Sequence, residues 1–269
     1  MRGHGRGLDS RTLKTKPKAT YVYCVVAADR RPRLTRVPGG LPGAGSVRLL
    51  DVDKGLFMAV ADIPLDRYSE SAINSGLASL DWVSRIAVAH EAVVESFIAS
   101  KAVLPMKLFT IFTADERALE HVRAQRARIA GIVKRVSNQQ EWGVRVVLDR
   151  TLAPAAPPQK RLKVGSGVSY LAQKKAQRDS VKELASRARE TVAALFDRLA
   201  ARSGDAKRRA ASEMPAKGGP LLLDAAFLVP RARAATFKAL AARESKALAR
   251  QGYGLSISGP WPPYTFVQD

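Results

Sequence analysis

Cysteine, histidine and acidic residues are scarce in this chain of 269 residues, and each shortage narrows its chemistry. Cys24 is the one cysteine, so no intramolecular disulfide is possible and no cysteine spacing indicates a metal site. The histidines are His4, His90 and His121. His90-Glu91 begins like a zinc-protease motif, but Val94 stands where the second metal ligand would fall. We therefore expect no metal site.

Glycine-rich phosphate loops are lacking as well. The segment 39–45 is rich in glycine but contains no Gly-Lys-Ser/Thr, and Arg48 stands where a dinucleotide fingerprint needs its last glycine. A turn around Pro42 accounts for this segment. The carboxylates are scattered singly, with no pair in an apolar setting suited to acid–base catalysis. The sequence predicts no catalytic residues and no cofactor, so we expect that the protein is not an enzyme.

Long apolar runs are also missing. None approaches the about 18 residues that a membrane-spanning helix needs. The N-terminus carries six basic residues between Arg2 and Lys18, but no apolar region follows them, so it is not a secretory signal. We expect a soluble protein of the cytoplasm.

Positive charge is in excess, with 45 Lys and Arg against 24 Asp and Glu and a formal net charge of +21. Such an excess favours anionic partners, namely nucleic acid, an anionic membrane surface or an acidic protein. A generally basic proteome explains the charge equally well. Aromatic residues make up only 6% of the chain and do not alternate with the basic residues, which disfavours specific nucleic-acid recognition.

Composition divides the chain into a tail and two domains. Residues 1–19 form a basic, glycine-rich tail that we expect to be disordered. Residues 20–138 are assigned to an N-terminal α+β domain and residues 139–269 to a C-terminal domain. The C-terminal domain contains a proline-rich linker at 153–168 and a polar, flexible loop at 203–219.

The N-terminal domain is predicted to alternate strands and helices. Strands are expected at 21–27, 47–52 and 56–63, and the segment 102–112 is either an edge strand or two short extended pieces. Asp81 is expected to cap a helix, and Thr113 with Glu116 matches a capping box for a helix that runs to about Val136.

The C-terminal domain is predicted to follow the order strand, helix, strand, helix, strand. The expected elements are strands at 141–148, 221–229 and 254–258 and helices at 169–202 and 231–250. This order is typical of a ferredoxin-like sheet with helices on one face. The longest helix has an apolar stripe of Leu171, Val181, Leu184, Ala188, Val192, Leu195, Phe196 and Leu199, and a basic face between Lys174 and Arg202. A solvated helix face and a binding face explain these cations equally well.

Several segments in a fixed order resemble one known family. They are Tyr21-Val22-Tyr23, Gly40-Leu41-Pro42-Gly43, Asp81-Trp82, Ala89-His90-Glu91-Ala92-Val93-Val94-Glu95, Val103-Leu104-Pro105-Met106-Lys107, Glu141-Trp142-Gly143-Val144, Tyr170-Leu171, Ala226-Phe227-Leu228-Val229-Pro230 and Ser258-Gly259-Pro260-Trp261-Pro262-Pro263-Tyr264-Thr265-Phe266-Val267. Together they are similar to the gas vesicle GvpL/GvpF family, and the last segment is the most specific.

The resemblance implies an accessory protein needed for the formation of gas vesicles, the gas-filled protein shells of some microbes. It implies a minor shell-associated or chaperone-like factor that binds the shell protein GvpA and other accessory proteins. It also implies two α+β domains, the C-terminal one a modified ferredoxin-like domain, and no catalytic residues. Cys24, the run Lys107-Leu108-Phe109 and the +21 charge depart from the usual family pattern.

The closing segment carries the candidate binding residues Trp261, Tyr264 and Phe266. Three prolines, at 260, 262 and 263, fix an extended backbone around Trp261. One hypothesis is that these aromatic residues bind a partner. The alternative is that Trp261 and Phe266 close the core or pack the two domains together. A basic adaptor for nucleic acid or an anionic membrane is the alternative function.

Overall fold

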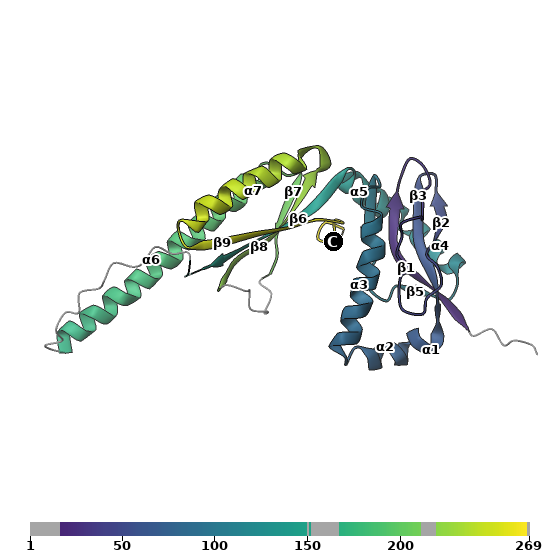
Figure 1. The fold of residues 1–269 in the computed structure, drawn as a ribbon, viewed down its shortest axis with the longest axis horizontal. Helices are drawn as coiled ribbons and strands as arrows, with labels where there is room; N and C mark the ends of the chain where they lie inside the picture. Colours follow the sequence, from purple (N-terminus) through teal and green to yellow (C-terminus); the bar gives the residue numbers. More distant parts are fainter. Residues whose placement is uncertain (1–16, 150, 152–166, 211–218, 268–269) are drawn as a thin grey trace, which may run out of the picture. The chain divides into compact units, whose positions relative to one another are not determined.

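The computed structural model in Figure 1 describes residues 17–149, 151, 167–210 and 219–267. Its contacts form two compact units. The first contains the described residues up to Val25, with 31–96 and 106–126, and the second contains 26–30, 97–105 and the described residues from Ala127 onward. Residues 127–138 thus group with the second unit, although the sequence analysis placed them in the N-terminal domain. Compact units are not the same as domains, so the domain boundary at 138/139 stays a prediction.

The N-terminal sheet has the strand order β2-β3-β1-β4, and β5 pairs with β1. Its strands are β1 (Lys18–Ala27), β2 (Arg48–Asp53), β3 (Leu56–Pro64), β4 (Ala102–Pro105) and β5 (Ile111–Phe112). The helices that follow these strands are α1 (Leu65–Tyr68), α2 (Glu70–Gly76), α3 (Leu80–Ser96), α4 (Asp115–Ala124) and α5 (Arg126–Val136). The three predicted strands are confirmed, and the segment around Pro105 forms two short strands. Because Lys18 begins β1, the predicted tail is too long at its end; residues 1–16 lie outside the described residues.

Two predicted helix caps are wrong, and one predicted helix is divided in two although it ends at Val136 as expected. Ser79, not Asp81, caps α3, because its Oγ accepts the Trp82 N–H at 3.3 Å. No side chain caps α4, whose N-cap is Ala114; the capping box with Glu116 does not form. The helix expected to reach Val136 is interrupted at Gln125 (φ −98°, ψ 16°), where the backbone leaves helical geometry and α5 begins.

The second sheet has the order β7-β8-β6-β9, and every neighbouring pair is antiparallel. The elements are β6 (Gln139–Leu148), α6 (Gly167–Ala200), β7 (Asp205–Arg208), β8 (Leu221–Pro230), a short 3-10 turn (Arg231–Arg233), α7 (Ala234–Ala249) and β9 (Tyr253–Trp261). This connectivity is the ferredoxin-like arrangement that the sequence predicts. The α+β fold class is confirmed.

Strand β7 lies inside the segment 203–219, which the sequence analysis assigned to a flexible loop. Its residues have weak strand propensity, but the edge of β8 supplies backbone partners from Ala225 to Leu228. Residues 211–218 of that segment, and 152–166 of the predicted linker, lie outside the described residues. Gly167 and Val168, also assigned to the linker, begin α6.

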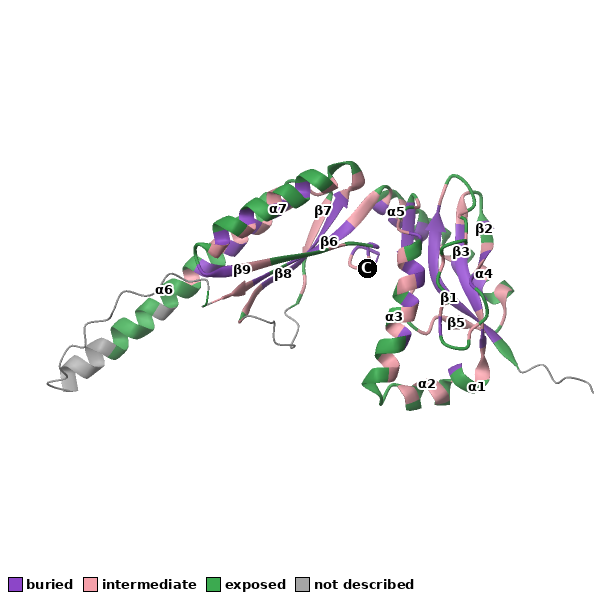
Figure 2. Cartoon of the chain, in the orientation of Figure 1, coloured by how far each residue is buried: buried purple, intermediate pink, exposed green. Residues whose placement is uncertain are grey.

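Helices α6 and α7 pack on one face of the second sheet and build its core (Figure 1). From the predicted stripe of α6, Ala188, Val192, Leu195 and Leu199 are buried. Leu184 is 61% exposed, contrary to the prediction, because α6 continues beyond the sheet at that end (Figures 1 and 2). The side chains of Leu171 and Val181 lie outside the described part of the chain.

His90 lies in the interior of the first unit. Its side chain is 3% exposed, and its Nδ1 lies 2.8 Å from the Tyr21 hydroxyl. The rings of Tyr21 and Tyr23 are centred 5.7 and 5.6 Å from the imidazole. Burial lowers the pKa of His90 to about 4, because the charged imidazolium is poorly solvated there. The histidine therefore packs as a neutral, hydrogen-bonded core residue.

The free energy of unfolding should fall as the pH drops below 6.5. The pKa of His90 is about 4 in the folded chain and about 6.5 when unfolded, so the unfolded state binds the proton first. The loss attributable to His90 should reach about 2–3 kcal/mol near pH 4.5. Urea denaturation at pH 7 and 4.5 measures it, with His90→Gln as the reference that cannot titrate. Equal pH dependence in the two proteins would contradict the prediction.

Candidate interaction site at the C-terminal segment

The second sheet has one apolar face and one polar face. On β6, Trp142, Val144 and Val146 point toward the core under α6 and α7. Because side chains alternate along a strand, the residues between them point to the opposite side. We call this side the polar face, and it consists of Glu141, Arg145, Lys207, Arg209, Asp224, Ser256, Ser258 and Trp261 with the adjoining segment 262–267.

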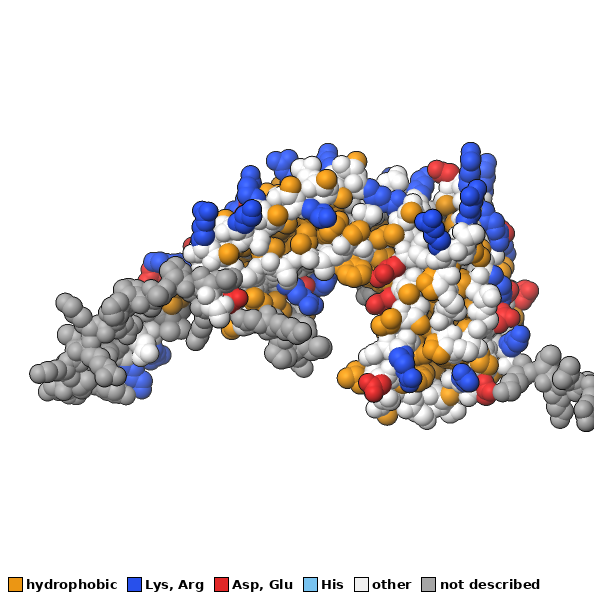
Figure 3. All heavy atoms as spheres, in the orientation of Figure 1, with side chains coloured by type: hydrophobic (Ala, Val, Ile, Leu, Met, Phe, Trp, Pro, Cys, Tyr) orange, Lys and Arg blue, Asp and Glu red, His pale blue; other side chains and the backbone are white. Residues whose placement is uncertain are grey.

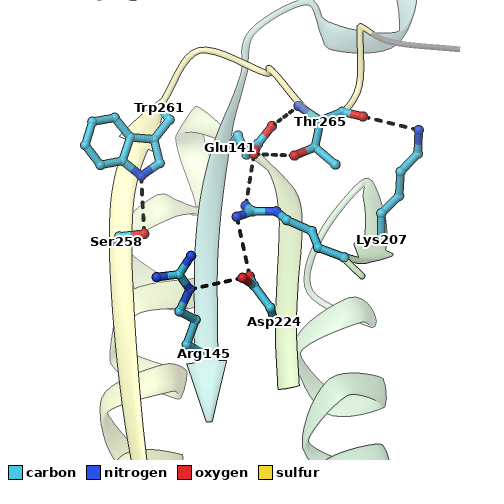
Figure 4. Close-up of polar contacts among 8 residues, drawn as sticks. Glu141, Arg145, Lys207, Asp224, Ser258, Trp261 and Thr265 are labelled. Carbon is cyan, nitrogen blue, oxygen red and sulfur yellow. Dashed lines mark hydrogen bonds and ion pairs between the residues drawn. The ribbon is translucent and has the colours of Figure 1, made fainter. Parts of the chain in front are cut away.

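Glu141 fastens the C-terminal segment to this face (Figure 4). The residue is 3% exposed, and its carboxylate accepts the backbone N–H and the hydroxyl of Thr265, both at 2.7 Å. Arg209 donates to the same carboxylate at 3.1 Å. Burial raises the pKa of Glu141, whereas the bonds from Thr265 and the charge of Arg209 lower it. These bonds hold a buried charge that would otherwise be unfavourable.

Arg209 also connects Glu141 to Asp224, which is 7% exposed. The distance between Arg209 and the Asp224 carboxylate is 3.4 Å, and Arg145 donates to its other oxygen at 3.0 Å. Two arginines thus balance two buried carboxylates on the polar face.

Further contacts fix the last residues. Arg135 donates to the Phe266 carbonyl at 2.6 Å, and Lys207 donates to the Thr265 carbonyl at 3.3 Å. The ammonium of Lys207 lies 5.5 Å from the centre of the Phe266 ring, and Phe266 is fully buried. The end of the described chain is therefore part of the packed second unit.

A bulge in β9 sets the direction of Trp261. Gly143 pairs with Ser258 but Glu141 pairs with Trp261, so β9 has one residue more than β6 over this stretch. The extra residue turns Trp261 onto the polar face, where its Nε1–H donates to the Ser258 hydroxyl at 3.3 Å. Gly259 has φ 118°, and a Cβ there would lie 2.8 Å from the Glu141 carbonyl oxygen, so the position requires glycine.

The three candidate binding residues differ in accessibility. Trp261 is 37% exposed, Tyr264 is half-buried and Phe266 is fully buried. The structure brings them together in one segment, but only Trp261 presents a large apolar surface to solvent. Their role in binding stays a prediction.

Glu141, Asp224 and Arg209 organise the site, and none of them is among the site residues predicted from the sequence. The available signal was a single acidic residue in each of two apolar strands, in Glu141-Trp142 and Leu223-Asp224-Ala225. Within the described part of the chain, no group of histidine, cysteine, aspartate and glutamate could hold a metal ion. Among the described helices, none combines the length and apolarity required to cross a membrane.

The model of the family described as "Gas vesicle synthesis protein GvpL/GvpF" matches residues 19–268. The chain belongs to this family. It is 28% identical to gas vesicle protein L of Streptomyces sp. (strain CB03234) over 252 residues, which is 92% of each protein. The resemblance drawn from the sequence motifs is therefore confirmed.

Solved structures of GvpF share the fold of this GvpL/GvpF-family chain. GvpF from Anabaena sp. PCC7120 superposes with a TM-score of 0.65 at 17% identity, covering 94% of this chain and 97% of that one. GvpF from Microcystis aeruginosa gives a TM-score of 0.63 at 16% identity, covering 93% and 99%. At such identity these structures establish the architecture alone.

Replacing Glu141 by Gln should loosen the C-terminal segment. The variant keeps the shape of the side chain but loses the charge that Arg209 and Thr265 bind, at a cost of about 1–3 kcal/mol in unfolding free energy. Hydrogen exchange of a peptide spanning 262–267, together with urea denaturation, measures both effects. Glu120→Gln is the matched control, because Glu120 is exposed and, among the described residues, forms its ion pair with the exposed Arg117. Unchanged protection of the Thr265 amide in Glu141→Gln would show that Glu141 is not the anchor.

Proposed function

We propose that this GvpL/GvpF-family protein is needed for gas vesicle formation and binds the shell protein GvpA as a chaperone-like or minor shell-associated factor. The observation that carries the proposal is the match over residues 19–268 to a family whose description names gas vesicle synthesis. The similarity to gas vesicle protein L over 92% of the chain supports the same role. Other gas vesicle accessory proteins are further expected partners.

A factor that holds an apolar shell subunit needs an apolar surface of its own. The end of β9 offers one, because Trp261 is 37% exposed on the polar face. Tryptophan at a protein interface contributes a large contact area and often dominates the binding energy. Trp261 is therefore the residue of the closing segment that we expect to contact GvpA.

The residues around Trp261 hold its side chain in a fixed position, which favours binding. Pro262 and Pro263, directly after it, are buried, and Thr265 is fastened to Glu141. The bond to Ser258 also holds the indole in place before any partner arrives. A side chain that is already ordered loses less conformational entropy on binding, so more of its contact energy appears as affinity.

Trp261→Ala should abolish or strongly weaken capture of GvpA in a pull-down after co-expression. A binding loss above about 2 kcal/mol is expected for a central interface tryptophan. Leu80→Ala is the control, because Leu80 is 79% exposed and lies in α3, which belongs to the other unit. Circular dichroism must show that Trp261→Ala remains folded. Full GvpA capture by a folded Trp261→Ala protein would end the proposal for this residue.

The second candidate function is a basic adaptor for nucleic acid or an anionic membrane. It is favoured by the exposed cations of α6, which include Lys175, Arg178, Lys182 and Arg189. Figure 3 shows Lys and Arg side chains lining the outer surface of α7 as well. Such surfaces attract polyanions through counterion release, and that attraction weakens as salt is added.

A titration with labelled duplex DNA and with vesicles containing phosphatidylserine tests the adaptor function. If it is correct, binding persists at about 0.15 M salt and is lost when Lys175, Arg178 and Lys182 are changed to Gln. The control changes Arg33, Arg36 and Arg85 to Gln, which removes the same charge from exposed positions outside α6 and α7. If binding disappears at that salt concentration, or if both triple variants weaken it equally, the attraction is nonspecific and the adaptor function is contradicted.

A further inference from the structure

Strand β9 forms a free edge of the second sheet. It stands last in the order β7-β8-β6-β9, and β6 is its only strand partner among the described residues. Edge strands are usually protected from further pairing by charged residues, prolines or bulges. The stretch Tyr253–Ser258 contains no charged residue and no proline, and its register with β6 is regular. The bulge and Pro260 come only after it.

The backbone direction of β9 follows from its register. The Asp149 N–H donates to the Gly252 carbonyl at 2.9 Å, so Gly252 points its backbone groups toward β6. Backbone groups alternate in direction along an antiparallel strand. Tyr253, Leu255 and Ile257 therefore point their N–H and C=O groups away from β6, toward the free side. These are the groups that an added strand would bind.

The two sides of this edge differ chemically. Ile257 pairs with Val144, so its side chain lies on the side of α7, where it is 38% exposed. On the polar face, Ser256 lies directly across from Arg145, whose side chain is 57% exposed. Figure 2 shows the exposed stretch of β9 in green. A strand added here would place one set of its side chains beside Ile257. The other set would lie on the polar face, beside Ser256 and on the same side of the sheet as Arg145.

We infer that the free edge of β9 binds an extended segment of an acidic partner protein by strand addition. The segment would alternate apolar side chains, on the side of Ile257, with carboxylates on the side of Arg145. Main-chain hydrogen bonds supply affinity in this mode, and the alternating side chains supply specificity. The formal charge of +21 favours an acidic partner and opposes a second copy of this chain, since two copies repel each other. The mode of binding does not depend on GvpA being the partner.

The experiment measures fluorescence anisotropy with a short labelled peptide in which valine alternates with glutamate. The full chain should bind this peptide, and Ile257→Lys should weaken binding by about tenfold or more, since a lysine blocks pairing at an edge. The same peptide with alternate backbone nitrogens methylated should not bind, because it has lost its donors. A peptide with lysine in place of glutamate should bind more weakly.

Leu184→Lys is the matched control, because Leu184 is 61% exposed on α6 and gains the same charge. Ile257→Thr retains strand propensity and should bind the peptide nearly as well, which guards against misfolding as the cause of a loss. Equal binding by wild-type protein and Ile257→Lys, or by the methylated peptide, would overturn the inference. A dimer of the chain that Ile257→Lys abolishes would assign the edge to a second copy instead. The two proposals can be told apart. If Trp261→Ala loses GvpA capture but still binds the peptide, Trp261 serves GvpA binding and the edge of β9 binds the peptide independently of it.

Discussion

The buried carboxylate of Glu141 is the constraint on which the C-terminal site depends. An ionised group that is only 3% exposed is tolerated where its oxygens are bonded. Thr265 and Arg209 satisfy this requirement, and they belong to segments far from Glu141 in sequence. The need to bind one charge thus joins the C-terminal segment and the residue after β7 to the central strand β6. Asp224 extends the same network through Arg209.

This network separates the structural from the accessible part of the closing segment. Phe266 is buried beside Lys207, and the prolines at 262 and 263 are buried as well. The bulge at Gly259 and Pro260 leaves Trp261 on the polar face with part of its ring in solvent. A rigid, partly exposed tryptophan next to an uncharged edge strand is an arrangement suited to protein recognition.

Local sequence patterns predicted most elements well. The strands predicted at 47–52 and 56–63 form the β2–β3 hairpin, and Gly55 in the turn between them adopts φ 72°. The helix starts were predicted less well. No side chain caps α4, and Asp115 in its first turn binds Arg48 and Thr20 from the sheet. Strand β7 escaped prediction because its pairing with β8 does not depend on its own propensity.

The sequence alone determined the family, the ferredoxin-like order of elements apart from β7 and the position of the closing aromatic residues, because these depend on local periodicity and on motifs in a fixed order. It could not distinguish Phe266 as a core residue from Trp261 as a surface residue, since both are aromatic and lie near prolines. That distinction came from the β-bulge and from the bonds of Glu141 to Thr265, which join residues separated by 124 positions. Such pairings depend on how strands meet in space, and only the tertiary structure decides them.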